Sequence, residues 1–238
     1  MCNNPQFLYH YTSIKTLAYI LKNRTIKFNS LSHVDDLTEC QTQDLHDFGK
    51  YCYVSCWTDK ETEDIPMWIM YAQKGHGIRI RMKCNPFIHM DFNVPDNYIR
   101  YPNKEYELGK VIYPLGKTIQ NTKINYSDTS EEPSLAIGAK VFVKPPCWNF
   151  QNEWRYCLAY IPNINYLDQN VQNKIDTINP IWDEIFINLD SSAFETMEIL
   201  MGPMTDDADN IIVNALLKQY NIKASIRESV FKDKVDLK

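Results

Sequence analysis

The stretch FLYHYTSIKTLAYILKNRTIKFNSL, residues 7–31, decides how the chain begins to fold. Its first six residues, FLYHYT, are rich in aromatics and predict a short strand. Thr12 or Ser13 can cap a helix in which apolar residues recur at i, i+3, i+4 and i+7 from Ile14. Residues 25–31 alternate apolar and polar side chains, so they predict a second strand.

Outward from this stretch, strands and helices are mixed without regular βαβ alternation. Three more helices are predicted: a short one within residues 32–48, after a loop at Asp35 and Asp36, one starting at Pro66, and one spanning 206–220. The last carries apolar Ala208, Ile211, Ile212, Ala215 and Leu216. Residues 85–104 hold three prolines and predict a loop, and residues 117–134 a variable insertion. The mixture predicts an α+β fold with mostly antiparallel sheets. The further predicted strands cover residues 51–57, 78–82, 107–113, 140–144, 153–160, 183–189, 198–201 and 223–230.

The composition is that of a globular protein. Of the 238 residues, 44% are hydrophobic and 23% charged, and no interdomain linker is visible, so residues 1–238 are predicted to form a single domain. No segment approaches the roughly 18 apolar residues of a membrane span. The N-terminus lacks the basic and apolar regions of a signal peptide. The sequence therefore predicts a cytoplasmic protein without a membrane partner.

Charge and cysteine content narrow the function classes. The net charge of −5 argues against broad electrostatic binding to nucleic acid. Seven cysteines, an odd number without C-x-x-C spacing, predict reduced thiols and no metal site. No Walker loop, G-x-G-x-x-G, G-x-S-x-G or H-E-x-x-H motif occurs, whereas Cys–His nucleophilic catalysis stays an open alternative.

Polar and aromatic residues gather at three places. His10 lies mid-strand, either as a core histidine with one hydrogen bond or as a ligand-holding residue at the lip of a cleft. Trp68 and Tyr71 share a helix face at i, i+3, either packed against the sheet or stacked on a planar ring. Ser55 and Trp57 precede them at a strand end, where ligand contacts often collect.

Charged residues alternate along two predicted strands. Glu153 and Arg155 leave the same face of one strand, between large aromatics, and either form a solvated face or hold a catalytic carboxylate in place. Arg79 and Arg81 also share a strand face. They are either exposed edge charges or bidentate contacts to phosphate.

Four motifs in this order resemble a bacterial family of unknown function. They are Tyr9-His10-Tyr11-Thr12-Ser13, Met67-Trp68-Ile69-Met70-Tyr71-Ala72 followed by Gly77-Ile78, the stretch Trp148 to Arg155, and Gly202-Pro203. The resemblance covers about residues 7–220. Where the family carries a first Glu in the third motif, this chain has Gln151.

The same order of motifs, strands and helices resembles the His-Tyr-Glu form of the ADP-ribosyltransferase superfamily. This resemblance implies a fold of split, mostly antiparallel sheets with flanking helices, and NAD as the substrate. His10 would hold the adenosine-side ribose, Tyr71 or Trp68 would stack on nicotinamide, and Glu153 would stabilise an oxocarbenium-like transition state. Tyr11 replaces the glycine that usually follows the histidine, which would narrow the pocket.

The resemblance implies NAD cleavage at the nicotinamide–ribose bond, as in an intracellular toxin or anti-phage effector, with a protein or nucleic acid as the unknown acceptor. Two alternatives remain open at this stage. One is a non-catalytic nucleotide-sensing domain that uses the same cleft. The other is an RNA-directed phosphotransferase or nuclease. The expected catalytic residues are Glu153, His10 and Tyr71, and the expected cofactor-binding residues are Tyr11, Thr12, Ser55, Trp57, Trp68, Arg79 and Arg155.

Overall fold

The computed structural model describes residues 4–36, 39, 47–102, 106–114, 141–163 and 177–237. The predicted insertion at 117–134 lies outside these residues. Within them, ten strands join one sheet, with four α-helices around it. The strands are β1 (Phe7–Thr12), β2 (Thr25–Ser30), β3 (Cys52–Thr58), β4 (Ile78–Lys83), β5 (Tyr98–Tyr101), β6 (Glu107–Lys110), β7 (Glu153–Pro162), β8 (Glu184–Asn188), β9 (Glu198–Met201) and β10 (Ser225–Glu228). The helices are α1 (Ile14–Asn23), α2 (Ile65–Tyr71), α5 (Ser191–Glu195) and α6 (Asp207–Gln219).

The sheet runs in the order β10-β9-β4-β1-β3-β2-β8, and β7 pairs with β3, β5 and β6. All of these strand pairs are antiparallel except β9 with β10. The prediction of an α+β fold with a mostly antiparallel sheet is therefore confirmed.

The sheet divides at β3. One edge of β3 pairs with β7 along its whole length, from Cys52 opposite Ala159 to Thr58 opposite Glu153. The other edge is shared: β1 joins it only at Thr58, and β2 only at Tyr53 and Val54. Among the described residues, none pairs with residues 55–57 of β3 on that edge, which leaves a gap between β1 and β2.

Local sequence explains where helix α1 begins and ends between β1 and β2. Ser13 caps α1, with its Oγ accepting a hydrogen bond from the backbone N–H of Thr16 at 2.9 Å. The helix ends at Arg24, which adopts a left-handed conformation. Leu17 and Leu21 are buried on one face, as the i, i+4 spacing predicts.

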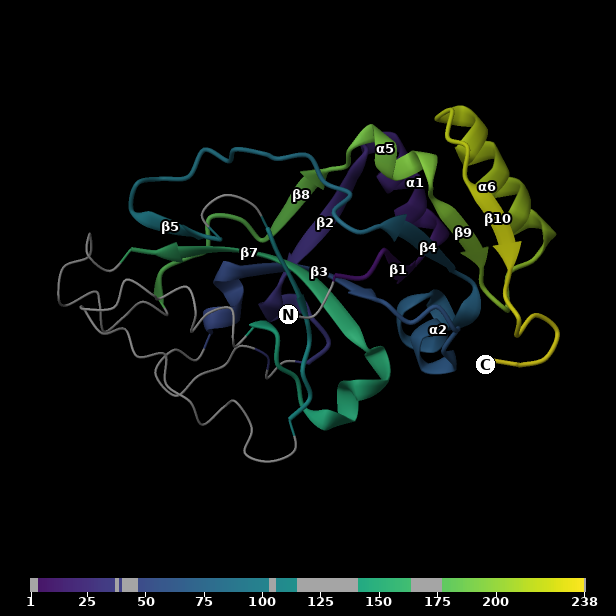
Figure 1. Cartoon of the computed structure of the whole chain (residues 1–238), viewed down its shortest axis with the longest axis horizontal. Coiled ribbons are helices and arrows are strands. Elements are labelled where there is room, and N and C mark those ends of the chain that lie inside the picture. Colours follow the sequence, from purple (N-terminus) through teal and green to yellow (C-terminus); the bar gives the residue numbers. More distant parts are fainter. Residues whose placement is uncertain are drawn as a thin grey trace.

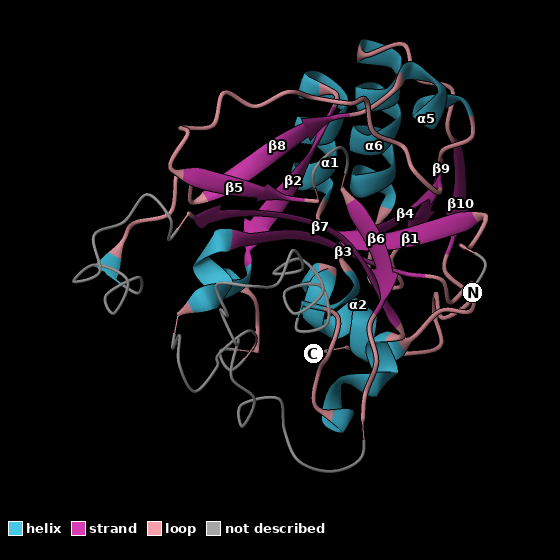
Figure 2. Ribbon diagram, turned by 60° about the vertical axis from the view of Figure 1, so that its left-hand side comes forward, coloured by secondary structure: helices cyan, strands magenta, loops and turns pink. Residues whose placement is uncertain are grey.

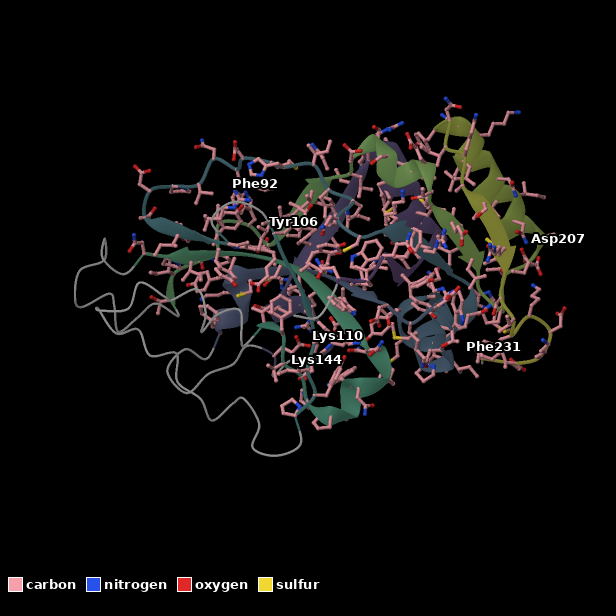
Figure 3. All side chains as sticks on the ribbon, in the orientation of Figure 1. Phe92, Tyr106, Lys110, Lys144, Asp207 and Phe231 are labelled. Carbon is pink, nitrogen blue, oxygen red and sulfur yellow. The ribbon has the colours of Figure 1, made fainter. Side chains whose placement is uncertain are left out.

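The helices cover two faces of the sheet, with α1, α5 and α6 on one side and α2 on the other (Figures 1 and 2). The first face forms the main core, where Leu17 and Val213 from the helices meet Leu8 and Ile80 from the sheet. On the second face, Trp68 of α2 packs against Tyr11 in a smaller cluster. Side chains fill both layers (Figure 3).

Two predicted stretches between β4 and β7 differ from the structure. The loop prediction for 85–104 missed β5, which pairs with the last residues of β7. The strand prediction for 140–144 was also wrong. Within its described part, Val143 makes only an isolated bridge to Ile112, because Pro145 and Pro146 follow at once and cannot extend a ladder.

Helix α6 begins where expected but turns a different face to the core. A capping box between Asp206 and Asp209 fixes its start. The structure buries Val213 and Leu217, whereas Ile211 is 69% exposed. The sheet accepts only a narrow stripe of this edge helix, so the apolar residues chosen from the sequence mostly face outward. None of the helices in the described ranges is long and apolar enough to cross a membrane.

The turn after β9 depends on Gly202. A methyl group at this position would lie 2.1 Å from the carbonyl oxygen of Gly75. That oxygen belongs to the backbone and accepts a hydrogen bond from the N–H of Met204, so it cannot move aside. We expect Gly202→Ala to lower the free energy of unfolding by about 1–3 kcal/mol, measured by urea denaturation. Gly109→Ala is the comparison, since its added methyl meets the ring of Phe142, a side chain that can shift. An equal or larger loss in Gly109→Ala would contradict this explanation.

Candidate functional site

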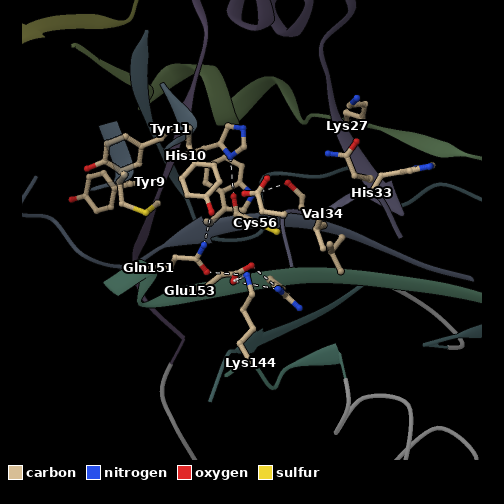
Figure 4. Close-up of a pocket in the computed structure, with 18 residues that line it drawn as sticks. Tyr9, His10, Tyr11, Lys27, His33, Val34, Cys56, Lys144, Gln151 and Glu153 are labelled. Atoms are coloured by element: carbon tan, nitrogen blue, oxygen red, sulfur yellow. Dashed lines mark hydrogen bonds and ion pairs between the residues drawn. The ribbon is translucent and has the colours of Figure 1, made fainter. Parts of the chain in front are cut away.

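A cavity of about 230 Å³ occupies the gap in the sheet, and we call it the split-sheet pocket (Figure 4). Strands β1, β2 and β3 supply its walls, α2 closes one side, and the start of β7 forms another. Figure 4 shows Lys27 and His33 on the opposite side of the pocket from Tyr9 and Tyr11. The pocket lies where β3 pairs with no other described strand, between its contacts with β1 and β2.

The three residues expected to carry the chemistry come together here. His10 from β1, Tyr71 from α2 and Glu153 from β7 all line the split-sheet pocket. Of the residues expected to bind the cofactor, four also line it: Tyr11, Ser55, Trp57 and Arg155.

Thr12, Trp68 and Arg79 do not line this pocket. Trp68 is completely buried, with its indole N–H donated to the Glu63 carboxylate, so it has no face to offer a ligand. Arg79 lies on β4 and faces a second, smaller cavity. Trp68 thus belongs to the support of the site, because it packs edge-on against Tyr11.

His10 is fixed in one orientation. Its Nδ1 lies 2.9 Å from the carbonyl oxygen of Cys56, across the gap between β1 and β3. Since a carbonyl can only accept, Nδ1 carries the hydrogen and Nε2 carries the lone pair in the neutral ring. Burial lowers the pKa of His10, although the bond to Cys56 opposes that shift. A neutral His10 therefore presents a hydrogen-bond acceptor at Nε2.

Tyr71 is held by Gln151. The side-chain amide of Gln151 donates from Nε2 to the Tyr71 hydroxyl at 2.5 Å, and its Oε1 accepts from Lys144 at 2.9 Å. Burial raises the pKa of Tyr71, and the Asp35 carboxylate raises it further. Tyr71 therefore stays a neutral phenol that offers a ring and a hydroxyl to a ligand. Gln151 thus connects Tyr71 to the buried charge of Lys144.

Four buried charges meet at one wall of the pocket, and we call them the ion cluster: Glu39, Lys144, Glu153 and Arg155. All of them except Glu39 line the pocket. Glu153 contacts Arg155 Nε through Oε1 at 2.6 Å and Lys144 Nζ through Oε2 at 3.0 Å. Glu39 contacts the same two cations, at 2.9 Å from Lys144 and 2.6 Å from Arg155. Two carboxylates thus balance two cations in a closed ring of ion pairs.

Glu153 is ionised throughout the physiological range. Burial alone would raise the pKa of this carboxyl group, but Arg155 and Lys144 outweigh burial and lower the pKa to about 2. Its side chain is only 3% exposed, at the wall of the pocket. The site therefore holds a fixed negative charge whose counter-ions, Lys144 and Arg155, lie at the same wall of the pocket.

Cys56 is the cysteine that lines the pocket. Burial raises the pKa of its thiol well above the ordinary value, and the Glu153 carboxylate raises it further. A thiol in this setting stays protonated and is a poor nucleophile. The geometry thus disfavours the alternative of Cys–His catalysis, although His10 and Cys56 are neighbours.

Sequence reasoning missed Lys144, Glu39 and the part played by Gln151. Lys144 follows a short apolar run, and Glu39 lies in a polar segment, so neither has a local pattern that distinguishes it from a surface charge. Both are buried because the fold places Glu39 against Arg155, and Lys144 against Glu39 and Glu153. A usable signal was the Pro-Pro pair after Lys144, which marks a rigid turn back into the sheet.

The comparisons with known proteins bear on the family. Residues 67–156 match the model of a family described as a protein of unknown function, DUF2971. This range contains the Met67–Ala72 and Trp148–Arg155 motifs, and the expected relationship to a family of unknown function is confirmed. No curated protein and no solved structure matches the chain.

Proposed function

We propose that the protein binds NAD in the split-sheet pocket and cleaves the bond between nicotinamide and ribose. One observation carries this proposal: His10, Tyr71 and Glu153, from three elements far apart in the sequence, line a single cavity. A neutral acceptor, an aromatic ring and a fixed carboxylate are what recognition of a ribosyl pyridinium requires. The order of the pieces and the divided sheet also support an ADP-ribosyltransferase-like fold.

His10 and Tyr71 would bind the substrate. The Nε2 lone pair of His10 accepts a hydrogen bond from a ribose hydroxyl, because Nδ1 is committed to Cys56. The ring of Tyr71 offers a face for the flat nicotinamide, held in place by Gln151. The aromatic side chains of Tyr9 and Tyr11 also line the pocket.

Glu153 would act when the glycosidic bond breaks. The bonding electrons leave with the pyridinium nitrogen, which makes nicotinamide neutral and places a positive charge on the ribose. A buried carboxylate stabilises that charge as it develops. A water molecule or an acceptor hydroxyl then bonds to the ribose carbon and loses its proton to solvent, which completes the balance. Glu153 is suited to this step because its low pKa keeps it ionised.

The size of the pocket limits what it holds. At about 230 Å³ it falls below the roughly 300–1,000 Å³ of pockets that enclose drug-sized ligands. This volume fits one half of a dinucleotide, with the remainder outside the pocket.

A second candidate function is nucleotide binding without turnover. The observation that favours it is the pairing of both Glu153 oxygens with Arg155 and Lys144, which reduces the charge left for a substrate. This candidate predicts that calorimetry detects NAD binding while the NAD concentration stays constant.

The test is nicotinamide release from NAD by the purified protein, with and without cell lysate as a source of acceptor. Wild type is expected to release nicotinamide. His10→Ala is expected to lower kcat/KM about 10- to 100-fold, mainly through KM, because the variant loses one ribose hydrogen bond and leaves the Cys56 carbonyl unpaired. Lys83→Ala is the control and is expected to act as wild type does, since it removes an exposed side chain on β4 that does not line the pocket. Absence of release from wild type under both conditions would reject NAD cleavage, and calorimetry would then decide on binding alone.

A further inference from the structure

A second cavity of about 60 Å³ lies beside the split-sheet pocket, and we call it the arginine cavity. Tyr9 lines both cavities, so the two adjoin at this residue. The volume is several times the roughly 10–15 Å³ that one water requires, which is room for a small anion. The side chains around it come from β1, β4, β9, β10 and the turn before α2: Tyr9, Glu61, Arg79, Arg81, Glu198, Ile199, Leu200 and Arg227.

Arg79 is a buried cation without a carboxylate partner among the described residues. It is 7% exposed, and its Nη1 donates to the Glu61 carbonyl oxygen at 2.9 Å and to the Tyr11 hydroxyl at 3.4 Å. Its Nε has no hydrogen-bond partner in the described ranges. A buried charge satisfied only by neutral groups is costly, and an anion beside it would offset that cost.

Arg81 extends the same surface. Its Nη2 pairs with Glu198 at 3.1 Å, and among the described residues its Nε lacks a partner, as does that of Arg79. Arg227 lies 3.5 Å from the same Glu198 oxygen, so two cations share this one carboxylate. Among the described residues that line the arginine cavity, three guanidinium groups thus face two carboxylates, those of Glu198 and Glu61.

Aromatic rings hold the guanidinium groups of Arg79 and Arg81 in place. The Arg79 guanidinium carbon lies 4.6 Å from the centre of the Tyr9 ring, and that of Arg81 lies 4.0 Å from the centre of the Phe7 ring. A guanidinium group that already packs on a ring loses little further side-chain entropy when it binds a ligand, and its N–H donors stay in a fixed arrangement. This geometry suits the bidentate binding of a phosphoryl group.

We propose that the arginine cavity binds a phosphoryl group through Arg79 and Arg81. The group is either free phosphate or part of a nucleotide whose other half occupies the split-sheet pocket, and the latter source rests on the proposed function. The shared residue Tyr9 would then lie between the ribose end and the phosphate end of one ligand.

The first experiment titrates inorganic pyrophosphate alone into the full chain by calorimetry at constant ionic strength. Wild type is expected to bind it, with Kd at least tenfold weaker in Arg79→Gln and intermediate in Arg79→Lys, which keeps the charge but not the fork. Lys83→Gln removes an exposed cation from the same strand outside the cavity, and is expected to bind as wild type does. Thermal melting without ligand confirms that each variant is folded.

The second experiment titrates ADP-ribose into the same proteins. One supporting outcome is that wild type binds ADP-ribose but not pyrophosphate, and that Arg79→Gln binds ADP-ribose at least tenfold more weakly. The nucleotide would then be the source of the phosphoryl group. Pyrophosphate binding would support it whether or not NAD is cleaved, which separates this proposal from the proposed function. The proposal is overturned if Arg79→Gln binds both ligands as tightly as wild type, if Lys83→Gln weakens binding equally, or if wild type binds neither ligand.

Discussion

The Arg155→Met variant is expected to lose about 3–5 kcal/mol of unfolding free energy, because it leaves two buried carboxylates with one cation between them. Arg155 is completely buried and contacts both Glu153 and Glu39 at 2.6 Å. It also donates from Nη1 to the carbonyl oxygen of Val141 at 2.6 Å, a bond that methionine cannot replace. In a chain of this length such a loss lowers Tm by about 6–20 °C, as calorimetry would record.

The pH dependence of this loss identifies its origin. In wild type, the lowered pKa of Glu153 contributes stability above its ordinary value of 4.5, and that contribution is lost as the pH falls towards 2. Without Arg155, burial raises the pKa of Glu153. At low pH the Glu153 carboxylate of the folded variant is therefore protonated, which removes the destabilising buried charge. The stability difference between wild type and Arg155→Met should therefore shrink below about pH 4.5.

Lys27→Met is the control for this prediction. It breaks an exposed ion pair with Glu184, whose two side chains are each 45% exposed, and should change stability by no more than about 1 kcal/mol. An Arg155→Met protein that melts within a degree or two of wild type would show that the ion cluster does not stabilise the fold.

The second large effect is expected in activity. Glu153→Gln should slow nicotinamide release by about 100- to 1,000-fold, because the amide keeps the shape of the side chain but cannot stabilise positive charge on the ribose. The variant also leaves Lys144 and Arg155 with Glu39 as their one carboxylate, so a loss of stability accompanies the loss of rate. The rate must accordingly be measured below the melting temperature of the variant.

Glu39→Gln provides the matched control. It removes the other carboxylate of the same ion cluster, yet Glu39 does not line the split-sheet pocket. We expect a similar loss of stability with nicotinamide release within about tenfold of wild type. Equal slowing in both variants would mean that Glu153 only supports the fold, which would favour binding without turnover.

The fold class and most strands followed from the sequence because their patterns are local. Alternation in Thr25–Ser30, the Ser13 cap and the Asp206 capping box each act within a few residues. The prediction for α6 was wrong about its buried face. Two apolar stripes are available on that helix, and only the packing against the sheet selects Val213 and Leu217.

The candidate site was predictable only in part. His10 and Glu153 could be named because each interrupts an aromatic pattern with a polar group, and Tyr71 because it shares a helix face with Trp68. Arg155 could be named beside Glu153, but Glu39 and Lys144 could not, since they look like ordinary surface residues in the sequence. The same is true of Arg79: its strand face was visible, but its place beside the second cavity depends on β9 and β10.

The pairing of β3 with β7 determines when this protein acquires its site. It joins Thr58 to Glu153 and Cys52 to Ala159, so closing the sheet requires a loop of roughly 100 residues. Such non-local pairing slows folding relative to local hairpins and helices. On the ribosome, β1, β2 and β3 emerge well before β7, and the nascent chain has no completed pocket until β7 has been synthesised. The ligand therefore cannot guide the early steps of folding and binds only after the sheet has closed.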